Sequence, residues 1–110
     1  MARTRTTFDP FNAVAEPKRR QVLEALGRQE LSVNEIVRKL GWSQPMVSKH
    51  LGVLKQVGLV KERRAGRQRL YRVDAAQLRP IFDWVSPFER FWSDKFDRLD
   101  ELLKEMKKEK

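Results

Sequence analysis

The sequence contains no cysteine and only one histidine, His50, among its 110 residues. The missing thiols exclude disulfides, thiolate metal sites, thiol catalysis and thiol-based redox sensing. One histidine cannot build a multi-histidine metal site within a single chain. No apolar run approaches the roughly 20 residues that span a bilayer, and the segment 1–7 lacks the apolar core of a signal peptide. We therefore expect a cytoplasmic protein with no metal, no cofactor and no membrane span.

Catalytic patterns are missing as well. Without cysteine, with one histidine and without a glycine-rich phosphate loop, the sequence offers no nucleophile–base pair and no cofactor constellation. A length of 110 residues with 40% hydrophobic residues is typical of one compact domain over residues 1–110. The sequence predicts a small binding protein and not an enzyme.

Positive charge is in excess and unevenly distributed. Lys and Arg number 24 against 15 for Asp and Glu, which gives a net charge of +9. Residues 61–73 alone carry six basic side chains and one acidic side chain, whereas residues 74–110 carry eight basic and nine acidic ones. Such an excess predicts a polyanionic partner, either nucleic acid or an anionic membrane surface.

Capping signals predict a helix-turn-helix over about residues 32–57. Ser32 and Glu35 have the spacing of a capping box, and Gly41 suits the turn after the first helix. Ser43 is placed to cap the second helix. Three apolar residues of that helix recur at i, i+4 and i+7 and are expected to face the core, namely Val47, Leu51 and Leu54.

A basic β-hairpin is predicted next, over about residues 59–73. Strand-like segments at Leu59–Arg64 and Gln68–Val73 flank the tip Ala65–Arg67, which contains a turn glycine. The hairpin contains most of the local excess of positive charge, so it is predicted to be a basic wing.

Further helices are predicted on both sides of this region. Two short helices with proline in their first turns precede the helix-turn-helix, and Asp74 is expected to open another helix after the wing. A long amphipathic helix, with a restart near Pro87, completes a C-terminal helical segment over about 75–108. The expected fold class is mainly α with a small β-wing (α+β), in the order α-α-α-α-β-β-α.

The second helix of the pair begins with the most specific segment of the chain. From Ser43 to Leu51 the sequence reads SQPMVSKHL, and Leu54 and Gly58–Val60 continue the pattern. The wing adds four residues to it, namely Arg64, Gly66, Arg67 and Tyr71. Over roughly residues 8–104 the chain resembles the ArsR/SmtB-type bacterial transcriptional repressors. The resemblance implies a winged helix-turn-helix homodimer that binds double-stranded operator DNA and is released by a ligand or signal.

The chain departs from the metal-sensing members of this family. Ser32 and Asn34 stand where arsenic and cadmium sensors carry two cysteines, and neither is a soft-metal ligand of comparable strength. No histidine follows His50, so the histidine set of the zinc sensors is missing too. The comparison implies a metal-independent branch. Its releasing signal is then a small organic inducer, a protein partner or a change in the protein's own concentration.

Eight residues are the expected DNA contacts. Gln44 is the best candidate for reading a base, because its amide can pair with N6 and N7 of adenine. Hydroxyl and cationic side chains suit phosphates or base edges. The helix is expected to supply Ser43, Gln44, Ser48 and Lys49, and the wing Arg63, Arg64, Arg67 and Arg69. The alternative is a solvated polar face. For His50 we expect a structural hydrogen bond, with a phosphate contact as the alternative.

An apolar stripe on the terminal helices predicts a dimer interface. It consists of Phe8, Phe11, Phe88, Trp92, Phe96, Leu99, Leu103 and Met106. The part from Phe88 to Met106 extends about 28 Å at ~1.5 Å per residue, which exceeds the span of so small a core. Packing within one chain is the alternative. A second alternative is a small-molecule pocket between protomers, lined by Phe82, Trp84, Phe91 and Trp92.

Two other functions compete with operator binding. A sequence-tolerant nucleic-acid-binding or packaging protein would also use a basic wing, although it would not need the polar face around Gln44. A peripheral membrane or scaffold protein would place the C-terminal helix on anionic lipid. That helix is nearly neutral, whereas a lipid-binding helix is expected to be basic.

Overall fold

The computed structural model describes residues 9–108, except the side chains at positions 93, 94, 96 and 108. Of the predicted interface residues, Phe8 lies outside the described residues, as does the side chain of Phe96. The chain divides into two compact units, one up to Pro80 and one from Ile81. Among the described residues no helix is long and apolar enough to cross a membrane.

Four α-helices make up most of the first unit, in the predicted order. They are α1 (Pro10–Ala15), α2 (Pro17–Leu26), α3 (Val33–Leu40) and α4 (Gln44–Val57). The capping box of α3 is present, since the Ser32 amide donates to Glu35 Oε1 at 2.8 Å and the Glu35 amide donates to Ser32 Oγ at 3.2 Å. Ser43 Oγ likewise accepts the Met46 amide at 3.3 Å. These caps satisfy amides that have no partner within their helices, which explains why both helices begin where the sequence predicts.

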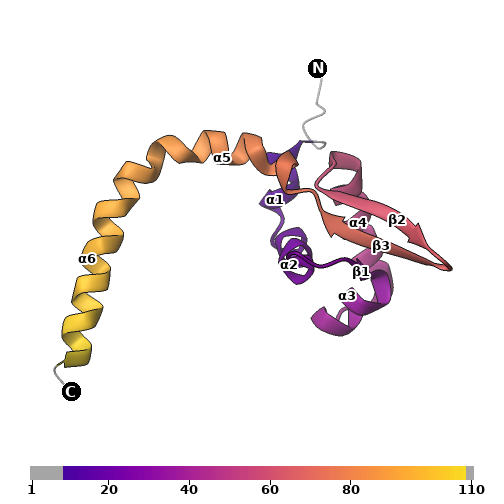
Figure 1. Cartoon of the computed structure of the whole chain (residues 1–110), viewed down its shortest axis with the longest axis horizontal. Helices are drawn as coiled ribbons and strands as arrows, with labels where there is room; N and C mark the ends of the chain where they lie inside the picture. The colour runs from indigo at the N-terminus through magenta and orange to yellow at the C-terminus, as the bar shows by residue number, and fades with distance from the viewer. Residues whose placement is uncertain (1–8, 109–110) are drawn as a thin grey trace. The chain divides into compact units, whose positions relative to one another are not determined.

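The sheet has one strand more than the sequence predicts. The wing is the antiparallel pair β2 (Val60–Ala65) and β3 (Gln68–Val73), and Figure 1 shows it projecting beyond the helices of this unit. A third strand, β1 (Leu31–Ser32), pairs with the other edge of β3, so the order is β1-β3-β2. The two strands of the predicted wing are confirmed, and β1 is an additional strand that the sequence did not predict. Two residues are too few to show alternation, and their partners Leu70 and Tyr71 are far away in sequence.

The core lies between the four helices and the base of the wing. The three predicted inward residues of α4, Val47, Leu51 and Leu54, are all buried, as the sequence predicts. Fully burying a leucine or valine side chain stabilises the fold by about 1.5–3 kcal/mol. The remaining large, fully buried side chains are Val22, Leu26, Ile36, Leu59 and Val60.

The link after the wing begins differently from the prediction. A 3₁₀ turn at Ala75–Leu78 follows β3, and the Asp74 side chain makes no cap hydrogen bond. Asp74 Oδ2 instead lies 3.4 Å from Lys61 Nζ on β2. A helical turn therefore begins after Asp74, as predicted, but it is a 3₁₀ turn, and the carboxylate pairs with a cation on the neighbouring strand.

The second unit is helical. It contains most of α5 (Arg79–Val85), a 3₁₀ turn at Ser86–Phe88 and α6 (Glu89–Lys108). The turn falls at the proline where the sequence predicts a restart, because proline has no amide hydrogen to continue the α-helical bonding. The second unit exposes large apolar side chains, including Phe88, Trp92, Leu99, Leu103 and Met106.

Candidate nucleic-acid interface

The four DNA contacts expected from α4 and its N-cap are exposed. Ser43, Gln44, Ser48 and Lys49 are all exposed, whereas Val47 is fully buried. Gln44 Nε2 donates to Ser48 Oγ at 3.3 Å, one turn further along. This bond orients the Gln44 amide along an exposed surface, where it remains able to pair with another group.

The two faces of the wing carry different sets of cations. The register places Arg64 opposite Arg69 and Glu62 opposite Tyr71, so these four side chains share one face. Arg63 belongs to the other face, opposite Leu70. The predicted arginine contacts are therefore not a single cluster.

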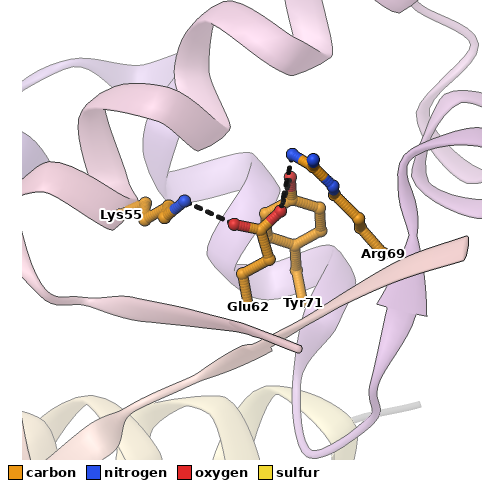
Figure 2. A network of polar contacts seen from close by, with 4 residues as sticks. All are labelled: Lys55, Glu62, Arg69 and Tyr71. Carbon is orange, nitrogen blue, oxygen red and sulfur yellow. Dashed lines mark hydrogen bonds and ion pairs between the residues drawn. The ribbon is translucent and has the colours of Figure 1, made fainter. Parts of the chain in front are cut away.

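A polar network centred on Glu62 connects the first face of the wing to α4. Figure 2 shows the Glu62 carboxylate between three donors from α4 and β3. It accepts a short bond from Lys55 Nζ, one from Tyr71 Oη at 3.2 Å and one from Arg69 Nη1 at 3.3 Å. The hydrogen bond from Lys55 is the main reason that the pKa of Glu62 lies below its usual value. One carboxylate thereby links the wing to α4.

The same carboxylate changes the chemistry of its neighbours. Burial, and then the negative charge of Glu62, raise the pKa of the Tyr71 phenol above its usual value. Lys55, Glu62 and Tyr71 were not among the functional residues predicted from the sequence. A signal for one of them was available, because Glu62 is the single acidic residue within 61–73.

Arg63 is held by a partner on the second face of the wing. Its Nε and Nη2 donate to the two carboxylate oxygens of Glu30 at 2.7 and 2.8 Å. This bidentate hydrogen bonding is the main reason that the pKa of Glu30 lies below its usual value. A phosphate contact by Arg63 would have to displace Glu30, so Arg63 is poorly placed among the eight expected contacts.

Arg64 and Arg67 differ from the other expected wing contacts. Neither has a hydrogen-bond or ion-pair partner among residues 9–108, and both are exposed. Arg67 also lines a shallow cleft with Gln44 of α4 and Asn34 of α3. The structure thus brings the predicted base-reading side chain and the tip of the wing to one surface.

Lys49 lies at a different hollow, on the side of α4 toward α2. This hollow is lined by Glu16, Lys18, Pro45, Met46, Lys49 and His50. Lys18 Nζ lies 5.1 Å from the centre of the Trp42 ring, in cation–π range. Cations therefore lie on both sides of α4, and Lys18 is one that the sequence analysis did not include.

His50 does not make the structural hydrogen bond expected of its Nδ1 atom. The residue is buried, at 6% exposure, and Nδ1 has no partner within the described part of the chain. The ring packs edge-on against Trp42, with centroids 6.3 Å apart. Burial lowers the pKa of this imidazole, so the neutral form is favoured. The expected structural hydrogen bond is therefore absent at Nδ1, because the imidazole ring packs against Trp42 instead.

The chain is similar in sequence to several bacterial transcriptional regulators. A family model described as bacterial regulatory protein, arsR family, matches residues 16–62. The HTH-type transcriptional regulator Rv2034 of Mycobacterium tuberculosis is 37% identical over 93 residues, which cover 84% of this chain and 84% of that protein. The transcriptional repressor SdpR of Bacillus subtilis is 28% identical over 78 residues, which cover 71% of this chain and 87% of the repressor.

Solved structures agree with the sequence relatives. A possible transcriptional regulator for arsenical resistance aligns with a TM-score of 0.60 and 37% identity, covering 89% of this chain and 96% of that one. An ArsR-like transcriptional regulator from Rhodococcus sp. RHA1 aligns with a TM-score of 0.63 and 26% identity, covering 84% and 87%. The predicted winged helix-turn-helix class is confirmed.

The Glu62 network predicts a measurable acid sensitivity. A carboxyl whose pKa is lowered in the folded state stabilises that state above its unfolded pKa of about 4.3, and the stabilisation is lost as pH falls through the lowered value. We expect Glu62→Gln to lower the free energy of unfolding at pH 7 by about 0.5–1 kcal/mol, because its cationic partners are exposed to solvent. As pH falls below about 4.3 the unfolded chain takes up the proton first, so the difference should shrink, and it should vanish once pH lies below the lowered pKa of the folded state.

Chemical denaturation at a series of pH values measures this difference. Glu24→Gln, which removes an exposed carboxylate on α2, is the control and should leave stability at pH 7 nearly unchanged. A Glu62→Gln variant with wild-type stability at pH 7 would contradict the role of the network.

Proposed function

Because this chain belongs to the ArsR family of bacterial regulatory proteins, we propose that it is a homodimeric repressor that binds an inverted-repeat operator. Proteins of this family regulate transcription and are not enzymes, which confirms the prediction of a regulator. In the proposed function α4 reads base edges, the wing holds phosphates, and no metal ion releases the protein. Its place of action is the cytoplasm.

The cleft shared by α4 and the wing tip is the observation that supports DNA binding best. Gln44 and Arg67 line it together, so a base reader and a phosphate-binding cation reach the same surface from two elements. The Glu62 network keeps the wing in place beside α4. A protein that only neutralises DNA would need the cations without this fixed geometry.

The proposed contacts fall into two groups with different physical roles. Gln44 can make a bidentate pair with adenine, with Ser43 and Ser48 beside it. Lys49, Arg64 and Arg67 supply charge to phosphates and carry no sequence information. Arg69 and Arg63 already have acidic partners, so they contribute by exchanging those partners for phosphate.

Base reading and phosphate binding should separate in a binding experiment. On a duplex selected by the purified protein from a random library, Gln44→Ala should lose about 1–3 kcal/mol of binding free energy, with little loss on random DNA. Arg67→Ala should weaken binding to both duplexes about equally and reduce the salt dependence by roughly one phosphate contact. Fluorescence anisotropy over a range of salt concentrations measures both effects.

Equal losses by Gln44→Ala on selected and random duplexes would show that Gln44 does not read a base. Equal affinity of the wild-type protein for both duplexes would favour the packaging function instead.

The exposed apolar stripe of the second unit supports the proposed dimer. Trp92, Leu99, Leu103 and Met106 are each 40% exposed or more. With Phe96 they follow alternating spacings of four and three residues, the pattern of a helix that packs against a second helix. We propose that a second copy of this chain covers the stripe, together with Phe11 and Phe88, and that Phe8 joins the same interface.

A charge in the stripe should abolish tight operator binding. Leu99→Asp would bury an unpaired carboxylate in the proposed interface, so we expect a monomer with weak binding to the selected duplex. The wild-type dimer should prefer inverted half-sites about 34 Å apart, one helical turn. Lys104→Asp, on the outer side of α6, is the control. Light scattering that gives the dimer mass for Leu99→Asp would reject this interface.

The residues at the metal-sensing positions of α3 support a metal-independent repressor. Ser32 Oγ already accepts the Glu35 amide, and Asn34 is exposed. Within the described residues, no group of three or more acidic or histidine side chains is suited to a metal ion. We propose that an organic ligand, a protein partner or protein concentration controls release from DNA, the aromatic surface of the second unit being the proposed place for a small organic inducer.

Metal ions should therefore leave operator binding unchanged. We expect the same anisotropy with micromolar free arsenite, Cd²⁺, Zn²⁺, Ni²⁺ or Cu⁺, because these ions favour thiolate or histidine ligands that the chain lacks. A chelator added afterwards is the control for each ion. Release by any of them, reversed by its chelator, would contradict a metal-independent repressor.

A further inference from the structure

Gly52 is the glycine that neither the backbone nor the core requires. The chain has five glycines, and the other four have positive φ angles. Gly52 lies inside α4, and a Cβ placed on it would meet no atom within 4 Å. Glycine is a poor residue for a helix interior, because it loses more conformational freedom on folding than alanine. Internal structure therefore offers no reason for glycine at this position.

Gly52 lies near the middle of the exposed side of α4. Successive residues of a helix are about 100° apart, which places Gly52 nearly opposite the buried stripe of Val47 and Leu54. Ser48 lies one turn before it and Gln56 one turn after it, and both are exposed. The main chain of α4 is thus open to a partner where the helix faces outward.

The surroundings of Gly52 are cationic. Lys49 and Lys55 lie three residues before and after it, and both are exposed. Lys55 is paired with Glu62 on the wing, so a phosphate at this position would take the place of that carboxylate, whereas Lys49 has no ion-pair partner among the described residues. The surface at Gly52 has no side chain and has a lysine on each side. An anionic partner could therefore approach α4 more closely here than at a position with a side chain.

We propose that the sugar–phosphate backbone of the operator passes against α4 at Gly52, between Lys49 and Lys55. The inference rests on the proposed DNA binding and adds a steric requirement to it. Gly52 has no group that can read a base, so its role is to set how closely α4 approaches the duplex. It is a positioning residue for the approach of α4 to any duplex.

Enlarging this residue should strengthen the fold and weaken binding. Gly52→Ala should raise Tm by several degrees, about 4–8 °C, because alanine is the better helix former. The same variant should lose about tenfold in affinity on both the selected and a random duplex, and Gly52→Leu should lose more, because added methyl groups overfill a close contact. The slope of log affinity against log salt should not change, because no charge is removed.

Thermal unfolding and fluorescence anisotropy measure the two effects on the same preparations. Gln21→Leu, on an exposed position of α2, is the matched control and should leave affinity at the wild-type value. Wild-type affinity of both Gly52 variants would overturn this inference while the proposed function stands. A loss confined to the selected duplex would also overturn it, because a base edge would then be the neighbour. Failure of the wild-type protein to bind any duplex would overturn the proposed function itself.

Discussion

The burial of one side of α4 is the constraint on which the rest of the structure depends. Val47, Leu51 and Leu54 are removed from water, and together they give the helix a single orientation about its axis. Ser48 and Lys49 then emerge on the surface, because they lie on other sides of the same helix. Gln44 lies seven residues before Leu51 and is exposed at the first residue of the helix. A rotation by one residue would move the apolar row by about 100° and expose part of it. The exposed polar surface is therefore a consequence of the core.

Three carboxylates organise the positive charge of the wing. Like charges so close in sequence repel one another, and Glu62, Glu30 and Asp74 each lie within ion-pair distance of cations on the strands. The paired cations become part of the scaffold. Arg64 and Arg67, beside and in the tip, keep no internal partner among the described residues and remain open to an anionic partner.

Local signals predicted most of the fold, and contacts distant in sequence account for what they missed. The caps at Ser32 and Ser43 depend on neighbours within three residues, which a sequence displays directly. Strand β1 was not predicted because its pairing partner comes almost forty residues later. Asp74 has the composition of a helix cap but binds Lys61 instead, and His50 packs against Trp42 without the expected bond at Nδ1. In each case a tertiary neighbour competes with the local pattern.

The sequence by itself determined the class of protein, the ends of the paired helices and the polar side of α4. Periodicity, caps and charge are properties of short segments, so they need no knowledge of the fold. Only the tertiary structure decided which arginines of the wing have a carboxylate partner. Arg63 and Arg67 look equivalent in the sequence, but a carboxylate 33 residues away holds Arg63, while Arg67 lines the cleft beside Gln44. The difference arises because an ion pair depends on distance in space, which the chain sets only once it has folded.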